Sequence, residues 1–174
     1  MGMRILVVDD EAASRTKMQT LMWTFGECVA TEHGSEAIKL FEEALTAGRA
    51  FQLITLDIEM PDLSGTEVLQ RIRRIESDHQ VGPDQRTKII MVTGRSDKDQ
   101  VVACVHCGCD AYIAKPFNLQ LVRAKMEKIG LGGNNPKANA PPKAATPQPV
   151  SADTIFNDIS QALRKGDLEL PMQP

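Results

Sequence analysis

The sequence alternates between two kinds of hydrophobic pattern over its first 130 residues. Short apolar runs rich in β-branched residues predict five strands, at residues 3–8, 28–31, 51–56, 88–93 and 111–114. Apolar residues that recur every three or four positions predict five helices, at residues 12–25, 35–47, 66–75, 99–107 and 119–129. Because strands and helices alternate, we expect an α/β fold with a parallel sheet covered by helices on both faces.

The composition changes abruptly at Gly130. Residues 131–150 are rich in proline, alanine and asparagine and hold five of the ten prolines of the chain. Such a segment buries too little apolar surface to fold, so it is interpreted as a linker. Residues 151–174 then place Ile155, Ile159 and Leu163 at helical spacing, which predicts one amphipathic helix. We therefore expect a domain at residues 1–130, a linker at 131–150, and a helix with its tail at 151–174.

The overall composition narrows the classes of function. Hydrophobic residues make up 42% and charged residues 25% of the 174 residues, which is typical of a globular protein. A net charge of -3 gives no electrostatic reason to expect direct binding of nucleic acid. No apolar run approaches the roughly 20 residues of a membrane-spanning helix, and the start of the chain lacks the layout of a signal peptide. Four cysteines do not suggest a disulfide scaffold, so we expect a cytoplasmic protein without membrane contact.

Chemically active residues stand where the predicted strands end. The third predicted strand is followed by Asp57, and a charge at the end of a buried strand is costly unless something compensates it. The first strand leads into Asp9 and Asp10, the fourth ends on Thr93, and the fifth runs into Lys115. Ligands of parallel α/β sheets bind beyond the carboxyl ends of the strands. The sequence therefore predicts that these residues form one site.

The residue types in this predicted site point to phosphoryl chemistry. Three carboxylates in close proximity need a cation, and hard oxygen ligands suit Mg²⁺, which readily shares its coordination sphere with a phosphate. An aspartate between that metal and a lysine is a plausible nucleophile toward a phosphoryl group. Mg²⁺ and the Lys115 ammonium would offset the charge on the transferred oxygens, and the Thr93 hydroxyl could donate a hydrogen bond to the product phosphate.

The motifs "ILVVDDE", "LITLDIEMPDLSG", "IIMVTG" and "CDAYIAKPF" resemble the receiver domain of bacterial two-component response regulators, the CheY-like domain, over residues 3 to about 129. The resemblance implies a doubly wound, flavodoxin-like sheet of five parallel strands in the order 2-1-3-4-5. It implies a phosphoacceptor with slow self-dephosphorylation rather than an enzyme. The implied phosphoryl donor is a sensor histidine kinase or a histidine phosphotransfer protein.

The same resemblance implies roles for individual residues. Asp57 would accept the phosphoryl group, and Asp10 and Asp57 would bind Mg²⁺ directly, for which Mn²⁺ can substitute. Asp9 would act through water, and the backbone carbonyl of Glu59 would complete the protein ligands. Lys115 would contact the phosphate, and its peptide bond to the following proline is expected to be cis.

Two further pairs of residues would govern the response to phosphorylation. Thr93 and Tyr112 would form the switch, in which Tyr112 turns into space vacated by the threonine. The surface of the fourth helix, fifth strand and fifth helix would then change and present itself to an output domain or a protein partner. Glu59 and Arg95 lie two residues after Asp57 and Thr93, so we expect them to overhang the phosphorylated aspartate and to tune its lifetime.

Alternative functions for these residues would require other residues in the sequence. A phosphatase of the haloacid-dehalogenase type also uses a strand-end aspartate, Mg²⁺ and a lysine, but it needs a second aspartate where this chain has Glu59. A flavin or dinucleotide site would need a glycine-rich loop after the first strand, which is absent from the sequence. The cluster of Cys104, Cys107 and Cys109 lacks a second ligand pair for a closed zinc site, so we interpret it as small buried residues.

The end of the chain, "ISQALRKGDLELPMQP", is similar to the opening helix and first strand of the EAL-type cyclic-di-GMP phosphodiesterase domain. This similarity covers only about sixteen residues and stops before any catalytic acid. It implies that the chain is the front of a longer regulator in cyclic-di-GMP signalling.

Overall fold

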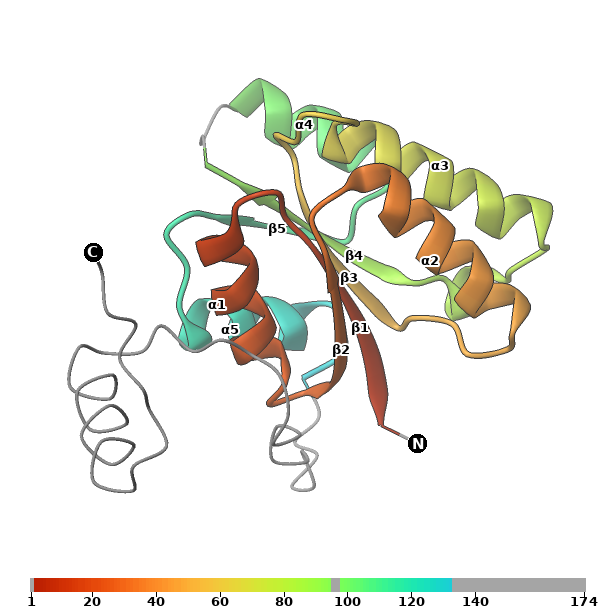
Figure 1. Ribbon diagram of the computed structural model, residues 1–174, viewed down its shortest axis with the longest axis horizontal. Helices are drawn as coiled ribbons and strands as arrows, with labels where there is room; N and C mark the ends of the chain where they lie inside the picture. The colour runs from red at the N-terminus through yellow and green to blue at the C-terminus, as the bar shows by residue number, and fades with distance from the viewer. Residues whose placement is uncertain (1, 95–97, 133–174) are drawn as a thin grey trace, which may run out of the picture. The chain divides into compact units, whose positions relative to one another are not determined.

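The computed structural model describes residues 2–94 and 98–132, which contain a five-stranded parallel sheet in the order β2-β1-β3-β4-β5 (Figure 1). This is the predicted α/β architecture and strand order. The strands are β1 (Met3–Val8), β2 (Gly26–Thr31), β3 (Leu53–Asp57), β4 (Lys88–Thr93) and β5 (Ala111–Ala114). The helices are α1 (Ala12–Met22), α2 (Gly34–Thr46), α3 (Gly65–Asp78), α4 (Lys98–His106) and α5 (Leu119–Lys128), with a short 3₁₀ helix, η1 (Pro83–Gln85), before β4.

Helices cover both faces of the sheet, α1 and α5 on one face and α2, α3 and α4 on the other (Figure 1). Side chains alternate between the two faces along each strand, so β1 sends Ile5 and Val7 into one core and Leu6 and Val8 into the other. The α1/α5 core also contains, among others, Met18, Met22, Val122 and Met126. The opposite core also contains, among others, Phe41, Val68, Leu69, Ile72 and Cys104. Because helices cover both faces, the central strands β1, β3 and β4 are nearly continuous apolar runs rather than alternating ones.

Some element boundaries differ from the predictions. Helix α1 ends at Met22 rather than at residue 25, and Phe25 packs against the α1/α5 core from the turn before β2. Strand β3 begins at Leu53, two residues later than predicted, although Phe51 is 3% exposed. In both places the apolar pattern reported burial correctly but not the type of element. The 3₁₀ helix η1 was not predicted.

No helix in the part of the chain that the structure describes is long and apolar enough to cross a membrane. The predicted C-terminal helix and tail at residues 151–174, the linker from residue 133 onward, and Arg95 all lie outside the described residues.

Candidate phosphoacceptor site

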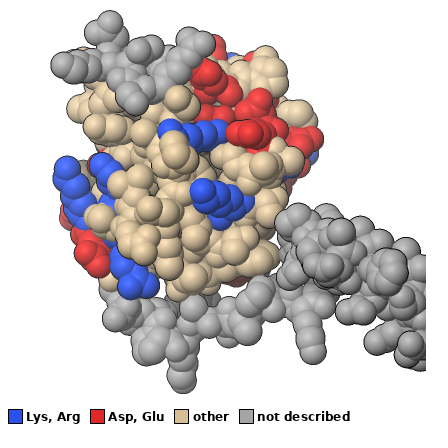
Figure 2. Space-filling model, turned by 90° about the vertical axis from the view of Figure 1, so that its left-hand side faces the viewer, with Lys and Arg blue, Asp and Glu red and all other residues tan. Residues whose placement is uncertain are grey.

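Three aspartates meet where β1 and β3 end. The two strands are paired neighbours, with Val8 opposite Leu56, so Asp9 follows β1 beside the last residue of β3, Asp57. One carboxylate oxygen from each of Asp9, Asp10 and Asp57 lies within 4.8 Å of the other two. Asp9 and Asp57 are buried, whereas Asp10 is exposed. On the side of the molecule where α1 and α5 lie, acidic side chains also gather in one patch of the surface with basic side chains beside it (Figure 2).

The Lys115 ammonium is the cation that faces these acids. Its Nζ lies 3.0 Å from Asp9 Oδ2, 3.4 Å from Asp57 Oδ2 and 3.7 Å from Glu11 Oε2. The Lys115–Pro116 peptide bond is cis, as the sequence predicted. The lysine side chain is only 20% exposed, so its charge acts on the carboxylates with little screening by solvent. One amine therefore contacts both buried aspartates.

Both oxygens of the Asp9 carboxylate accept hydrogen bonds from protein groups. Its Oδ1 accepts a hydrogen bond from the backbone N–H of Glu11 at 2.9 Å, and its Oδ2 accepts one from the Ser14 hydroxyl at 2.5 Å and contacts Lys115. The guanidinium of Arg15 donates to the Asp9 carbonyl at 2.7 Å and pairs with Glu32 at 3.1 Å. Sequence analysis missed both Ser14 and Arg15. Their only sequence signal is their place in the first turn of the helix that follows the aspartates.

Among the residues that the structure describes, none makes a hydrogen bond or an ion pair to the Asp10 carboxylate. The charge of Asp10 acts on Asp57, whose pKa it raises. Asp10 therefore differs from Asp9, whose two oxygens are already engaged. An exposed carboxylate beside two buried ones suits a direct ligand to a cation that arrives from solvent.

Burial and neighbouring charge make ionisation of Asp57 costly. Loss of solvent, and after it the charges of Asp9 and Asp10, raise the pKa of Asp57; Lys115 offsets part of this rise, and the resulting pKa is about 6. For Lys115, burial acts to lower the pKa, but the hydrogen bond to Asp9 and the charges of Asp57 and Asp9 outweigh it and hold the pKa above its usual value. The site thus contains a protonated lysine and more negative charge than that lysine balances.

The chain turns sharply after Asp57, and this brings α3 against the site. The Ile58 N–H donates to Val92 O of β4, and the Gly65 N–H donates back to Ile58 O, both at 2.9 Å. A Cβ at Gly65 would lie 2.2 Å from the carbonyl oxygen of Asp57, so only glycine fits where α3 begins. Ser64 caps α3 in a reciprocal capping box with Glu67. These bonds fix both ends of the loop between β3 and α3.

Thr93 and Tyr112 lie at different depths. Thr93 ends β4, is 1% exposed, and its carbonyl accepts the backbone N–H of Lys115 at 2.7 Å. Tyr112 on β5 is 40% exposed, and the Lys125 ammonium of α5 lies 4.8 Å from the centre of its ring. The predicted switch pair thus consists of a buried hydroxyl beside the site and a ring at the surface. Glu59 is exposed two residues after Asp57, whereas its predicted companion Arg95 is not described.

The cysteine cluster at the end of α4 is part of the core. Cys104 is 1% exposed, and Cys107 and Cys109 pack against the core beneath α2, α3 and α4. Burial raises the pKa of Cys104 and raises that of Cys109 to about 11, so these thiols stay protonated. Within the described ranges, the three aspartates are the only group of acidic, histidine or cysteine side chains placed to hold a metal ion. Cys104 is thus a small buried residue, as interpreted from the sequence, whereas Cys107 and Cys109 are only partly buried.

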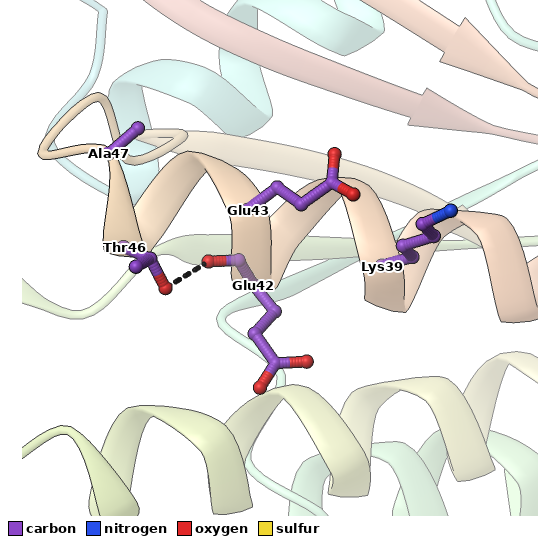
Figure 3. Close-up of a pocket in the computed structure, with 5 residues that line it drawn as sticks. All are labelled: Lys39, Glu42, Glu43, Thr46 and Ala47. Carbon is purple, nitrogen blue, oxygen red and sulfur yellow. Dashed lines mark hydrogen bonds between the residues drawn. The ribbon is translucent and has the colours of Figure 1, made fainter.

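A second depression lies on the last turns of α2, away from the aspartates. It has a volume of about 500 Å³ and is lined by Lys39, Glu42, Glu43, Thr46 and Ala47. The Glu42 and Glu43 carboxylates point to opposite sides of the helix, and the Thr46 hydroxyl donates to the backbone carbonyl of Glu42 at 2.8 Å (Figure 3). Because these side chains do not converge, the depression offers no chemistry comparable to that at Asp57.

Comparisons with known proteins agree with this arrangement. A chemotaxis protein CheY homolog from Campylobacter jejuni is 31% identical over 129 residues, which cover 73% of this chain and 92% of the homolog. A probable transcriptional regulator, ycf27 from Cyanidium caldarium, is 36% identical over 126 residues, 72% of this chain and 45% of that protein. The receiver domain of the Arabidopsis thaliana histidine kinase CKI1, complexed with Mg²⁺ and BeF₃⁻, superposes with a TM-score of 0.61 at 30% identity over 72% of this chain and 90% of that one.

The family model of the response regulator receiver domain matches residues 5–127. This range includes all five strands and all five helices, apart from the first two residues of β1 and the last residue of α5. None of these comparisons supports the phosphatase alternative. The buried aspartate at the end of β3, its two acidic neighbours and the lysine after β5 therefore lie in a known type of domain: the chain belongs to the response regulator receiver family.

Proposed function

We propose that this receiver accepts a phosphoryl group on Asp57, in a Mg²⁺-dependent reaction, from a sensor histidine kinase or a histidine phosphotransfer protein. The observation that carries the proposal is the surroundings of the Asp57 carboxylate. It is buried within 4.8 Å of Asp9 and Asp10 and lies 3.4 Å from the Lys115 ammonium. The similar Arabidopsis receiver, whose structure contains Mg²⁺ and BeF₃⁻, supports the same chemistry here.

Three hard carboxylate oxygens close together are a donor set that fits Mg²⁺. Asp10 and Asp57 would bind the ion directly, with the backbone carbonyl of Glu59, and Mn²⁺ could substitute. Asp9 would act through water, which agrees with the engagement of both its oxygens by protein donors. When bound, the ion supplies positive charge that offsets the charge on the phosphoryl oxygens.

The chain's own residues then have defined tasks in the transfer. An oxygen of the ionised Asp57 carboxylate attacks the phosphorus while the phosphorus–nitrogen bond to the donor histidine breaks. The imidazole leaves with the electron pair of that bond and takes up a proton. The Lys115 ammonium and the Thr93 hydroxyl stabilise the transferred oxygens. Later attack by water on the phosphorus returns the Asp57 carboxylate and releases inorganic phosphate. Because this hydrolysis would be slow, the domain would act as a phosphoacceptor rather than as a turnover enzyme.

The response to phosphorylation would be presented on α4, β5 and α5. Among the described residues, the large apolar side chains that are exposed are Val102 and Val105 of α4, 53% and 60% exposed, and Tyr112 of β5, 40% exposed. Movement of Thr93 toward the phosphate and of Tyr112 inward would change this surface. An output domain or a protein partner would bind there. Glu59, with Arg95, would tune how long the phosphorylated state lasts.

The proposal extends to the organisation of the whole chain. Residues 1–130 would form the receiver and residues 131–150 a linker, and residues 151–174 would begin an output domain of the EAL type in cyclic-di-GMP signalling. All four cysteines are free thiols, as in proteins of reducing compartments, which supports a cytoplasmic location. We propose no direct contact with nucleic acid or membrane.

Incubation with acetyl phosphate and Mg²⁺ tests the proposed function. Mass spectrometry should find one added phosphoryl group, and the Asp57→Asn variant should gain none. Equal labelling of the variant would refute the assignment of Asp57. A generic phosphate ester should give no continuous release of phosphate, whereas steady turnover would favour a phosphatase.

A further inference from the structure

Asp62 connects the loop after the phosphoacceptor to a different helix. It lies five residues after Asp57, in the loop between β3 and α3. Its carboxylate accepts hydrogen bonds from the backbone N–H of Gly34 at 3.1 Å, and from the backbone N–H and hydroxyl of Ser35, both at 2.9 Å. Gly34 and Ser35 are the first residues of α2. Asp62 therefore caps a helix that begins 28 positions before it in the sequence.

Helix α2 has no cap of its own. Its N-cap residue, His33, makes no side-chain hydrogen bond to the first turn. The first N–H groups of a helix have no partners within the helix, and a carboxylate is well suited to them because it also meets the positive end of the helix dipole. Asp62 is exposed, and the slight loss of solvent around its carboxylate acts to raise its pKa, but the hydrogen bonds from Ser35 and Gly34 outweigh this and hold the pKa well below its usual range. The cap is therefore ionised at any working pH.

The start of α2 also packs closely on the same loop, at Met60 and Leu63, and on Val68 of α3. A Cβ at Gly34 would lie 2.7 Å from Val68 Cγ2, 3.2 Å from Leu63 Cβ and 3.3 Å from Met60 Cε. The helix end thus meets the loop by direct packing as well as through Asp62. The bonds of Ile58 and Gly65 fix the two ends of this loop, and Asp62 fixes its middle.

We infer that Asp62 is a positioning residue for the Mg²⁺ site, which holds the loop bearing the Glu59 carbonyl by tying it to α2. The inference rests on the proposed function, in which that carbonyl is a metal ligand. Glu59 lies three residues before Asp62, so movement of the middle of the loop would also move the Glu59 carbonyl. Loss of a partner that supports a metal ligand typically weakens metal binding, and we expect about tenfold weaker binding of Mg²⁺ without Asp62.

The test compares the full chain with three variants: Asp62→Ala, Asp62→Asn and Glu43→Gly. Asparagine keeps an oxygen acceptor and caps helices well, so it should restore most of the binding. Glu43 is exposed in the body of α2, and glycine there destabilises the same helix to a similar degree without touching the loop. Isothermal titration with Mg²⁺ gives the affinity. Labelling by acetyl phosphate is then measured at low and at saturating Mg²⁺.

We expect Asp62→Ala to bind Mg²⁺ about tenfold more weakly and to be labelled normally once Mg²⁺ saturates it, with Glu43→Gly unchanged. Parental affinity in Asp62→Ala, or an equal loss in Glu43→Gly, overturns the inference, because the effect is then absent or follows only from helix stability. A parent that binds no Mg²⁺ overturns it as well. The proposed function fails by a different result. In that case the parent protein gains no phosphoryl group at Asp57, whatever its affinity for Mg²⁺.

Discussion

Replacement of Asp57 by asparagine should stabilise the metal-free protein. The Asp57 carboxylate is 4% exposed and lies beside two other acids, so its pKa in the folded protein is about 6 instead of 3.8. Because the folded state holds the proton more tightly than the unfolded state, ionisation of Asp57 favours unfolding. This cost is fully present above about pH 6 and disappears as the pH falls from about 6 to about 4. Asparagine cannot ionise and escapes the cost.

The size of the effect follows from the two pKa values. They differ by about 2 pH units, and each pH unit corresponds to about 1.4 kcal/mol. The free energy of unfolding of Asp57→Asn should therefore exceed that of the parent by about 3 kcal/mol at pH 8, and by less than about 1 kcal/mol at pH 4. The attraction of Lys115 is already contained in the pKa of the parent. A gain of this size is a large fraction of the roughly 5–15 kcal/mol that stabilises an ordinary domain.

Urea unfolding followed by circular dichroism measures this difference, with chelator present and the parent and variant compared at each pH. Asp84→Asn is the matched control, because Asp84 is exposed in η1 and forms no ion pair among the described residues. Added Mg²⁺ should stabilise the parent at pH 8 much more than Asp57→Asn. A variant no more stable than the parent at pH 8, or an equal gain at pH 4, would show that burial and the neighbouring carboxylates do not make ionisation of Asp57 costly.

Three further predictions address phosphorylation itself. Asp10→Ala should lose most of the labelling by acetyl phosphate together with its Mg²⁺ requirement, whereas labelling that still rises with Mg²⁺ would exclude Asp10 as a direct ligand. Thr93→Ala should be phosphorylated but should show smaller amide chemical-shift changes on α4, β5 and α5, and parental shifts would contradict the switch. Replacement of both Glu59 and Arg95 by alanine should shorten the phosphorylated half-life by at most about fivefold, because an exposed pair contributes about 0–1 kcal/mol. Loss of phosphate after removal of the donor measures this, and an unchanged or longer half-life would show that the pair does not obstruct water.

Sequence patterns predicted the bounds of β1, β4 and β5 correctly. β1 and β4 are nearly continuous apolar runs because helices cover both faces of the sheet. β3 is buried at every residue but begins two residues later than predicted. At Phe25 and Phe51 the same patterns failed, since these side chains are buried or packed against the core from turns outside any helix or strand. A hydrophobic pattern indicates which residues are buried. It indicates whether they form a helix or a strand only when the run of apolar residues is long.

The sequence by itself determined which residues stand at the strand ends, because the alternation of strands and helices is a local property of the chain. It thus predicted that Asp9, Asp10 and Asp57 would meet. Only the tertiary structure decided what surrounds them. The contact between Lys115 and Asp57 spans 58 positions, and the cap that Asp62 provides to α2 spans 27 and 28. Burial and Coulomb interactions, which set the pKa of Asp57, depend on distances in space, and local periodicity contains no information about those distances.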